Sequence, residues 1–152
     1  MRVRILGCSG GIGGGRHTTS MLIDDDCLID AGSGVLRLGL DELARIDHVF
    51  LTHSHLDHIV ELPFLADLVV TQKSTPLKIY GLSSTLDDLR RYVFNDRVWP
   101  DFSAINLIGH TYKTIQFIEI ELDYPYRGPV DKLMCGSLYE CIGQAAMHCL
   151  LA

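Results

Sequence analysis

Three histidines and one aspartate stand close together in this chain, directly after a short apolar run. The cluster has the sequence His53-Ser54-His55-Leu56-Asp57-His58. The run before it, residues 48–52, predicts a strand. In an extended segment alternate side chains project to one side, so His53 and His55 can bind the same metal ion. Asp57 and His58 follow where the chain turns into a helix, and they can face a second ion.

Imidazole nitrogens and carboxylate oxygens are ligands that zinc accepts, which makes the cluster a candidate site for two divalent ions. Two such ions roughly 3.5–4 Å apart would activate water as a nucleophile at neutral pH. A polar loop that is merely rich in histidine is the alternative, but nothing in packing requires such a loop after a strand. We therefore take His53, His55, Asp57 and His58 as candidate metal ligands, with Asp57 also the candidate catalytic residue.

The composition fits one globular domain and excludes several classes of protein. The chain has 152 residues, of which 47% are hydrophobic and 21% are charged, which excludes a disordered tail or a collagen-like repeat. No apolar stretch reaches 18 residues, so no membrane-spanning segment is expected. A net charge of −6 counts against broad binding to a nucleic-acid backbone. Five cysteines without CxxC spacing, and no recognisable secretory signal, predict free thiols in the cytoplasm.

Strands and helices alternate along the chain, which predicts an α/β (α+β) fold. The expected strands occupy residues 3–7, 18–23, 27–29, 48–52, 77–80 and 118–122, and the expected helices residues 35–44, 59–70 and 84–94. The last of these helices begins with a capping-box pattern, Ser84 and Asp87. A tight acidic turn, residues 24–26, joins two early strands. The sheet should therefore be mixed and not purely parallel.

The last 19 residues differ in composition from the rest. Residues 134–152 hold one acidic residue, no lysine or arginine, and three of the five cysteines. One interpretation is a buried terminal helix over residues 138–151. The other is a foreign or read-through tail that displaced the original sequence. The expected organisation is thus an N-terminal part, residues 1–133, followed by an atypical apolar tail.

The histidine cluster and an earlier strand end resemble the signature of a known family. Residues 53–58, at the end of an apolar strand, resemble the HxHxDH motif of the metallo-β-lactamase superfamily. Leu28-Ile29-Asp30-Ala31-Gly32 is similar to another strand end of that superfamily. More narrowly, residues 6–11, 18–20 and 52–62 resemble class II cyclic-nucleotide phosphodiesterases. The resemblance covers about residues 3–130, and its superfamily part is the more specific.

This resemblance implies a metallo-β-lactamase-like αββα sandwich with metals at one edge, and hydrolysis of a cyclic nucleotide such as cyclic AMP. It implies that His53 and His55 hold the first metal and that Asp57 and His58 serve the second. Two zinc ions are the expected cofactors, with manganese or magnesium as alternatives. Asp30 would orient the histidine cluster from behind the ligands. A turn aspartate that bonds its own backbone is the alternative.

The second half of the family signature is missing. In the family a third histidine, a bridging aspartate and a final histidine complete the metal site, and no segment after His58 resembles them. We therefore expect an incomplete sandwich, made of the first mixed sheet and its flanking helices, with lowered metal affinity.

Three functions remain open from the sequence. The first is a metal-dependent cyclic-nucleotide phosphodiesterase, impaired by truncation. The second is a related hydrolase such as a transfer-RNA 3′-processing nuclease, and the third is a non-catalytic fragment that binds metal weakly. The expected partners are a small nucleotide and, through an exposed sheet edge, a second copy of the chain. Neither a membrane nor nucleic acid is an expected partner.

A glycine-rich loop between the first two expected strands is weaker evidence. Five of residues 10–15 are glycine, and backbone N–H groups of such loops can bind phosphate. No Lys-Ser or Lys-Thr follows, and a strand comes next, which excludes the P-loop and dinucleotide-binding patterns. We interpret the loop as one that passes close to the metal edge, with Arg16 or His17 near a substrate. The histidines not expected to be ligands are His48, His110 and His148.

Overall fold

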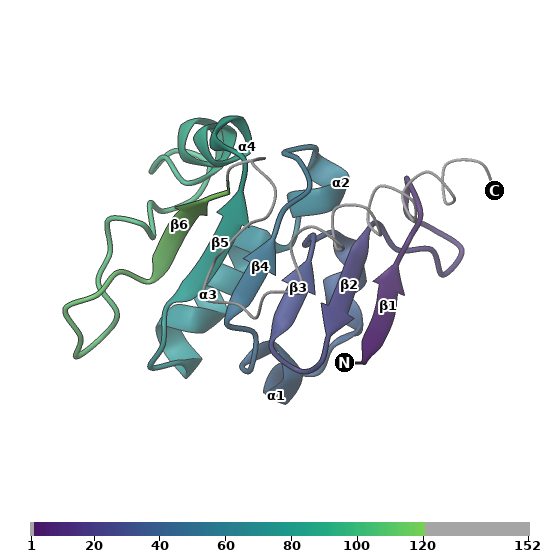
Figure 1. The fold of residues 1–152 in the computed structure, drawn as a ribbon, viewed down its shortest axis with the longest axis horizontal. Coiled ribbons are helices and arrows are strands. Elements are labelled where there is room, and N and C mark those ends of the chain that lie inside the picture. The colour runs from purple at the N-terminus through teal and green to yellow at the C-terminus, as the bar shows by residue number, and fades with distance from the viewer. Residues whose placement is uncertain (1, 121–152) are drawn as a thin grey trace.

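The computed structural model describes residues 2–120, which form one six-stranded sheet with helices packed against it (Figure 1). The strands are β1 (Val3–Gly7), β2 (Ser20–Ile23), β3 (Cys27–Ile29), β4 (His48–Phe50), β5 (Leu77–Gly81) and β6 (Ile115–Glu119). They lie side by side in sequence order. β1, β2 and β3 pair antiparallel, whereas β3 to β6 pair parallel. The prediction of a mixed sheet is confirmed.

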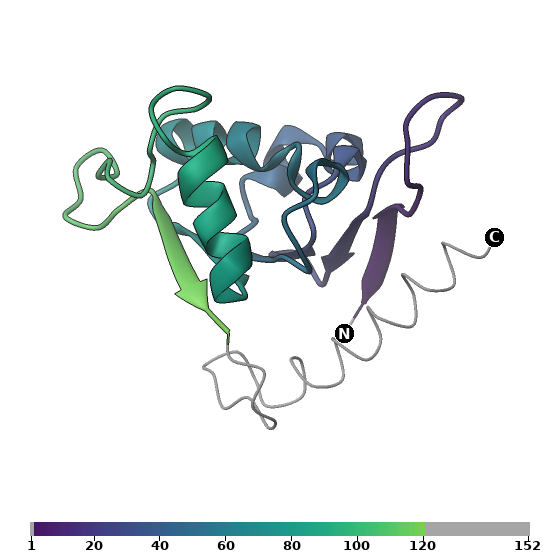
Figure 2. The same cartoon turned by 90° about the horizontal axis from the view of Figure 1, so that it is seen from above.

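Helices lie on one side of this sheet (Figures 1 and 2). They are the 3-10 turn η1 (Ser33–Arg37), α1 (Leu40–Leu43), α2 (Leu56–Ile59), α3 (Leu62–Gln72), α4 (Ser83–Asp88) and the π-helical turn η2 (Leu89–Val93). α3 buries Leu62, Leu65, Ala66 and Val69, whose spacing of three and four residues forms one apolar stripe. This stripe packs into a core shared with the sheet. Full burial of each large aliphatic side chain contributes about 1.5–3 kcal/mol.

The other face of the sheet carries a second apolar cluster. It contains Ile23, Ile29, Phe50 and Tyr80, and the rings of Phe50 and Tyr80 are stacked with centroids 4.3 Å apart. Because successive strand residues point to opposite faces, these side chains alternate with those of the first core. All three residues of β3 are buried, as expected of a strand with apolar layers on both sides.

Two of the expected helices differ from the structure. The helix expected over residues 35–44 is wrong, because η1 and α1 replace it. Leu38 and Gly39 between them are extended, with ψ angles of 140° and 164°, which interrupts the helical hydrogen bonds. The helix expected over residues 59–70 is confirmed in the main as α3, but it begins only after a break behind α2, with Pro63 in its first turn.

The capping box expected for the third helix is wrong. α4 has Leu82 as its N-cap residue and no side-chain capping bond, so Ser84 and Asp87 lie inside the helix. The helix ends in η2, where the hydrogen bonding becomes π-helical. The strand expected over residues 118–122 begins earlier, as β6 at Ile115.

Two expectations fall beyond the described residues. The terminal helix over residues 138–151 lies outside them, and the boundary at residue 133 stays a prediction. Within residues 2–120, no helix combines the length and the apolar character needed to cross a membrane.

Candidate active site

The histidine loop, residues 53–58, lies at the edge of the sheet where the parallel strands end, which we call the carboxyl edge. β4 ends at Phe50, and α2 starts at Leu56 with the extended residue His55 as its N-cap, at φ −63° and ψ 145°. His53 and His55 therefore precede the helix, whereas Asp57 and His58 lie within it. The predicted turn from strand into helix is confirmed.

Three imidazole rings of the histidine loop converge. The ring centroid of His53 lies 4.5 Å from that of His55 and 4.1 Å from that of His58. Burial lowers the pKa of His53, and the neighbouring charges of His58 and His55 lower it further. A lowered pKa keeps His53 neutral at physiological pH, and neutral imidazole is the form that binds metal ions.

Asp30 lies directly beneath the histidine loop and is fully buried. Its Oδ2 atom is 2.7 Å from Nδ1 of His58. Burial alone would lower the pKa of His58, but the hydrogen bond to Asp30 and the charges of Asp30 and Asp57 outweigh it and raise the pKa. With Nδ1 engaged, Nε2 of His58 is the nitrogen left to face outward, 3.5 Å from Oδ2 of Asp57. This is the geometry in which a carboxylate orients a metal-binding imidazole.

Thr52 is a site residue that the sequence reasoning missed. Its backbone N–H donates to Oδ1 of Asp30 at 2.9 Å, and its hydroxyl lies within 3.0 Å of both carboxylate oxygens. The same hydroxyl is 3.0 Å from Nδ1 of His53. Thr52 thus connects the buried carboxylate to two histidines. The only signal for it in the sequence is its position between the strand and His53.

The backbone around Asp30 presses against the start of α2. Asp30 has a left-handed conformation, φ +56°, which aspartate tolerates better than most residues. The N–H of Ala31 donates to the carbonyl of His58 at 2.6 Å. A side chain at Gly32 would place its Cβ 2.2 Å from the carbonyl oxygen of Asp57. Only glycine therefore allows the strand end to approach this closely, and the approach fixes the two segments relative to each other.

The donor set fits a metal ion in kind but supplies too few ligands to enclose one. Three converging histidine rings, with the Asp57 carboxylate beside His58, are nitrogen and oxygen donors of the type that zinc takes. Among the described residues, however, no group of three or more histidine, cysteine, aspartate or glutamate side chains is placed to hold one ion.

The remaining histidines of the described chain have other contacts. His48 is at the start of β4, the far end from the histidine loop, and its Nδ1 is 3.1 Å from the Tyr80 hydroxyl. His110 is exposed and stacks on Tyr112 with centroids 4.6 Å apart. His17 is 3.2 Å, through Nδ1, from the carbonyl of Ser33. His148 lies outside the described residues.

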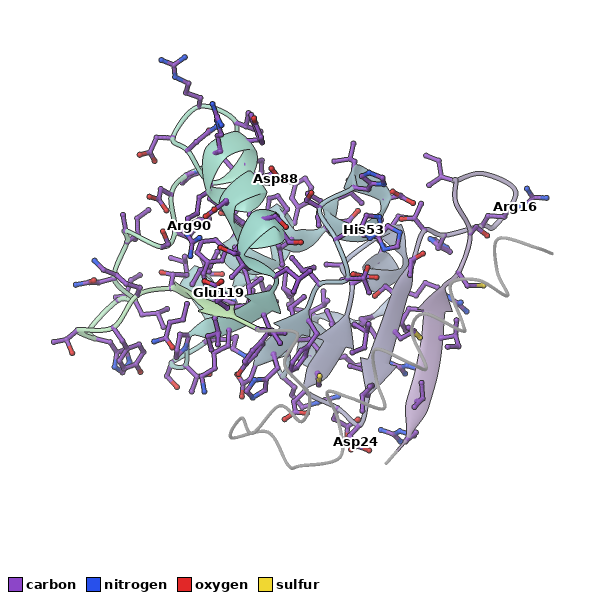
Figure 3. All side chains as sticks on the ribbon, turned by 45° about the horizontal axis from the view of Figure 1, so that its top comes forward. Arg16, Asp24, His53, Asp88, Arg90 and Glu119 are labelled. Atoms are coloured by element: carbon purple, nitrogen blue, oxygen red, sulfur yellow. The ribbon has the colours of Figure 1, made fainter. Side chains whose placement is uncertain are left out.

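The glycines of residues 10–15 are in open space, and the expected passage of this loop near the metal edge stays a prediction. A Cβ at Gly10, Gly11, Gly13, Gly14 or Gly15 would meet nothing within 4 Å. The close approaches occur instead at Gly7, against Thr18, and at Gly32. Figure 3 shows Arg16 on this loop, well apart from His53. The loop is open and exposed, so a role for Arg16 near a substrate stays a prediction.

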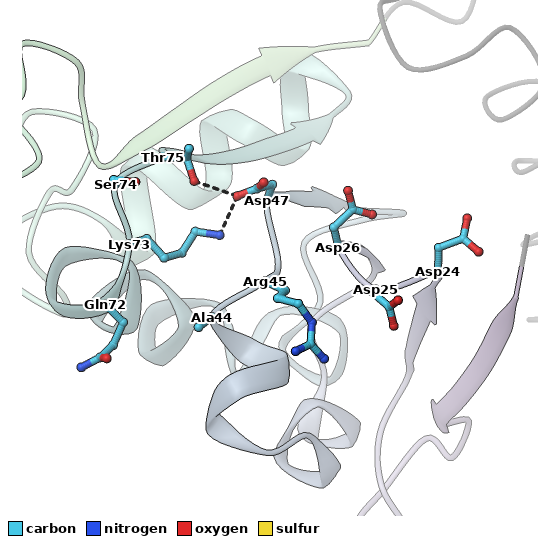
Figure 4. Close-up of a pocket in the computed structure, with 10 residues that line it drawn as sticks. All are labelled: Asp24, Asp25, Asp26, Ala44, Arg45, Asp47, Gln72, Lys73, Ser74 and Thr75. Carbon is cyan, nitrogen blue, oxygen red and sulfur yellow. Dashed lines mark hydrogen bonds and ion pairs between the residues drawn. The ribbon is translucent and has the colours of Figure 1, made fainter.

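A cavity of about 570 Å³ lies at the opposite edge of the sheet (Figure 4). Its lining includes the acidic turn 24–26, Arg45, Asp47 and Lys73. The acidic turn precedes β3, Arg45 and Asp47 precede β4, and Lys73 precedes β5. The cavity therefore lies where these strands begin. Nζ of Lys73 bonds Oδ1 of Asp47 at 2.6 Å and the carbonyl of Ile46 at 2.6 Å. The cavity therefore does not coincide with the histidine loop.

A family model and several known proteins match parts of this chain. The family model for class-II cAMP phosphodiesterases matches residues 41–125. A 3′,5′-cyclic-nucleotide phosphodiesterase 1 of Saccharomyces cerevisiae is 42% identical over 60 residues, which cover 39% of this chain and 16% of the relative. A ribonuclease Z of Bradyrhizobium diazoefficiens is 42% identical over 64 residues, 40% of this chain and 21% of the relative. The chain thus spans only a small part of these relatives.

Two solved structures share the fold. Unliganded yeast PDE1 superposes with a TM-score of 0.63 at 19% identity, over 78% of this chain and 50% of that structure. The metallo-β-lactamase fold protein YhfI from Bacillus subtilis gives 0.58 at 26% identity, over 84% and 48%. The described sheet and helices therefore have the metallo-β-lactamase fold, and the chain spans about half of each structure.

Proposed function

The chain belongs to the class-II cAMP phosphodiesterase family, and from that premise we propose that it acts in the metal-dependent hydrolysis of a cyclic-nucleotide phosphodiester. The observation that supports this proposal most is the contact between Asp30 and His58. A fully buried carboxylate bonds one imidazole nitrogen at 2.7 Å and leaves the other directed toward Asp57.

In this proposal His53 and His55 hold one divalent ion, and Asp57 and His58 hold a second. The ions are zinc, with manganese or magnesium as alternatives. When bound, such ions supply Lewis-acid activation of the phosphoryl oxygens and of water. The described residues give each ion two ligands, so we expect weak binding by this chain.

The chain's own residues position the donors and hold protons. Asp30 accepts a hydrogen bond from Nδ1–H of His58 and fixes the orientation of the ring. Thr52 donates to Asp30 and fixes the carboxylate in turn. Asp57, with 36% of its side chain exposed, is the carboxylate at this edge that can reach a substrate or its attacking water. We assign it the catalytic role on that ground.

A small cyclic nucleotide suits this chain better than a long RNA. The net charge is −6, which opposes binding to a polyanion unless basic residues collect on one surface. The match to a ribonuclease Z keeps RNA processing as the second candidate. A third candidate is a fragment that binds metal without catalysis.

A second copy of the chain is the macromolecular partner that we propose. β1 is the end strand of the described sheet, and Val3 and Ile5 on it are each 50% exposed. An open strand edge with exposed apolar side chains favours pairing with another strand. Sedimentation velocity of the chain at several concentrations would give its oligomeric state.

We would test the function by measuring bound zinc and hydrolysis of cyclic AMP on the purified chain. His55→Ala should lower both by at least tenfold, on the order expected when a ligand or its support is lost. His110→Ala is the matched control, because this exposed histidine lies outside the loop, and it should change neither. Cleavage of a precursor transfer RNA without cyclic AMP hydrolysis would favour the second candidate. Metal binding without either reaction would favour the third, and no metal uptake would contradict the proposal.

A further inference from the structure

The histidine loop has a second attachment, on the side away from Asp30. The hydroxyl of Ser54 donates a hydrogen bond to Oδ2 of Asp88 at the end of α4. These residues are 34 positions apart in the chain. Figure 3 shows Asp88 on α4 beside the segment that carries His53. The contact therefore joins the loop to a helix that has no other role in the site described above.

Ser54 stands between two candidate ligands and faces away from them. The rings of His53 and His55 contact each other, with centroids 4.5 Å apart, so both lie on one side of the segment. Because neighbouring side chains of an extended segment alternate in direction, Ser54 projects to the other side. A bond at Ser54 restrains the backbone of both histidines without occupying the space in front of them.

α4 is a firm support for this bond. Leu86 and Leu89, which flank Asp88, are 1% and 0% exposed, and Thr85 is buried as well. The Leu86 side chain lies against Gly81 at the end of β5, where an added Cβ would be 3.4 Å from it. The carboxylate of Asp88 is thus placed by a helix that is packed on the sheet.

Asp88 differs sharply from its neighbour Asp87. Asp87 is exposed and pairs with Arg90, Nη1 to Oδ1 at 2.9 Å. Asp88 is half-buried, and within residues 2–120 it forms no ion pair with a lysine, an arginine or a histidine. The hydrogen-bond partner of its carboxylate in the described chain is the Ser54 hydroxyl. Two adjacent carboxylates on one helix therefore make different contacts.

We propose that Asp88 is a positioning residue, which holds His53 and His55 in place for metal binding through its hydrogen bond to Ser54. The link to metal binding rests on the function proposed above, whereas the restraint on the loop does not. A hydrogen bond to a carboxylate is among the stronger ones in proteins. Groups that orient ligands from behind typically change metal affinity by about 10–100-fold when they are removed.

The test compares Asp88→Ala with Asp87→Ala, which removes the same charge from the adjacent residue of the same helix. Zinc affinity, measured by titration calorimetry on the full chain, should fall about tenfold in Asp88→Ala and stay within about twofold in Asp87→Ala. Asp88→Asn keeps an acceptor oxygen for Ser54 but loses the charge, and it should bind zinc nearly as the unaltered chain does. An equal loss in Asp88→Asn and Asp88→Ala would show a charge effect and overturn the proposal.

A second readout needs no metal. Amide hydrogen exchange of residues 52–56 in the metal-free chain should become faster in Asp88→Ala and, to the same extent, in Ser54→Ala. The double variant should exchange no faster than either single variant, because both changes remove the same hydrogen bond. Unchanged exchange in Asp88→Ala would overturn the positioning role. If the unaltered chain takes up no zinc while exchange responds as described, the proposed function fails and the restraint on the loop stands.

Discussion

The charged residues at the two edges of the sheet have different kinds of partner. At the opposite edge, Lys73 pairs with Asp47 and Arg2 pairs with Asp25, so two of the carboxylates there have cationic partners. At the carboxyl edge the buried Asp30 has no lysine or arginine partner among the described residues, and its contacts are Thr52 and His58. Paired charges neutralise each other and contribute to stability. A carboxylate that is bonded to an imidazole instead leaves a donor free for a ligand.

This contrast indicates that the carboxyl edge leaves nitrogen and oxygen donors for a ligand, whereas charged side chains at the opposite edge are paired with each other. The cavity of about 570 Å³ at the opposite edge does not coincide with the histidine loop. Variants at the carboxyl edge should therefore change both stability and zinc binding, whereas a variant at the opposite edge should leave zinc binding unchanged.

The largest effect is expected from Asp30→Ala. This change removes a fully buried carboxylate and leaves Thr52 and His58 without their common partner, which should cost about 3–5 kcal/mol of unfolding free energy. Urea unfolding followed by circular dichroism would measure it. Asp30→Asn keeps an acceptor for Thr52 and tolerates φ +56°, so it should lose clearly less. Equal losses in the two variants would contradict the role given to the side-chain contacts.

The next effect is expected from Gly32→Ala. Its Cβ would lie 2.2 Å from the Asp57 carbonyl oxygen, and the clash should destabilise the chain by about 1–3 kcal/mol. It should also weaken zinc binding, because Asp57 and His58 must move. Gly10→Ala meets nothing within 4 Å and serves as the control, with a change within about 0.5 kcal/mol. An equal change of unfolding free energy in Gly32→Ala and Gly10→Ala would mean that the close approach at Gly32 does not require glycine.

The smallest effect is expected at the opposite edge, from Lys73→Met. Burial alone would raise the pKa of Asp47, but hydrogen bonds from Lys73 and Thr75 outweigh it and hold the pKa below 3.8. A lowered pKa stabilises the fold above pH 3.8, and that contribution is lost as the pH falls through the folded-state pKa. Because 39% of Asp47 is exposed, Lys73→Met should cost only about 1 kcal/mol at pH 7.

The cost of Lys73→Met should shrink below pH 3.8, and zinc binding should stay unchanged. Unfolding curves at pH 7 and at about pH 3, together with a zinc titration, would check both statements. A loss of zinc affinity in Lys73→Met would remove the distinction between the two edges.

The sequence predicted those parts of the site whose signals are local. The histidine loop, its place after β4 and the turn into α2 follow from spacing and residue type within about ten residues. The mixed sheet follows from the acidic turn. The prediction of a helix over residues 35–44 was wrong because it rested on the spacing of apolar residues and did not account for Gly39, where the backbone is extended.

The supports of the site could not be predicted in the same way. Thr52 meets Asp30 across 22 positions, and Ser54 meets Asp88 across 34. Nothing in the local sequence distinguishes Asp88 from Asp87, and only packing of α4 on β5 decides which one faces the loop. The metal ligands themselves are still a prediction, and Asp30 was anticipated only through a family resemblance.

Nitrogen-15 NMR of the histidine rings, recorded as zinc is added, shows whether zinc binds at the carboxyl edge. Without metal, we expect His58 to carry its proton on Nδ1, where it donates a hydrogen bond to Asp30. On addition of zinc, the Nε2 or Nδ1 signals of His53, His55 and His58 should shift, while those of His48 and His110 should not. Zinc that leaves the three loop histidines unchanged, or that shifts all five alike, would contradict a metal site at the carboxyl edge.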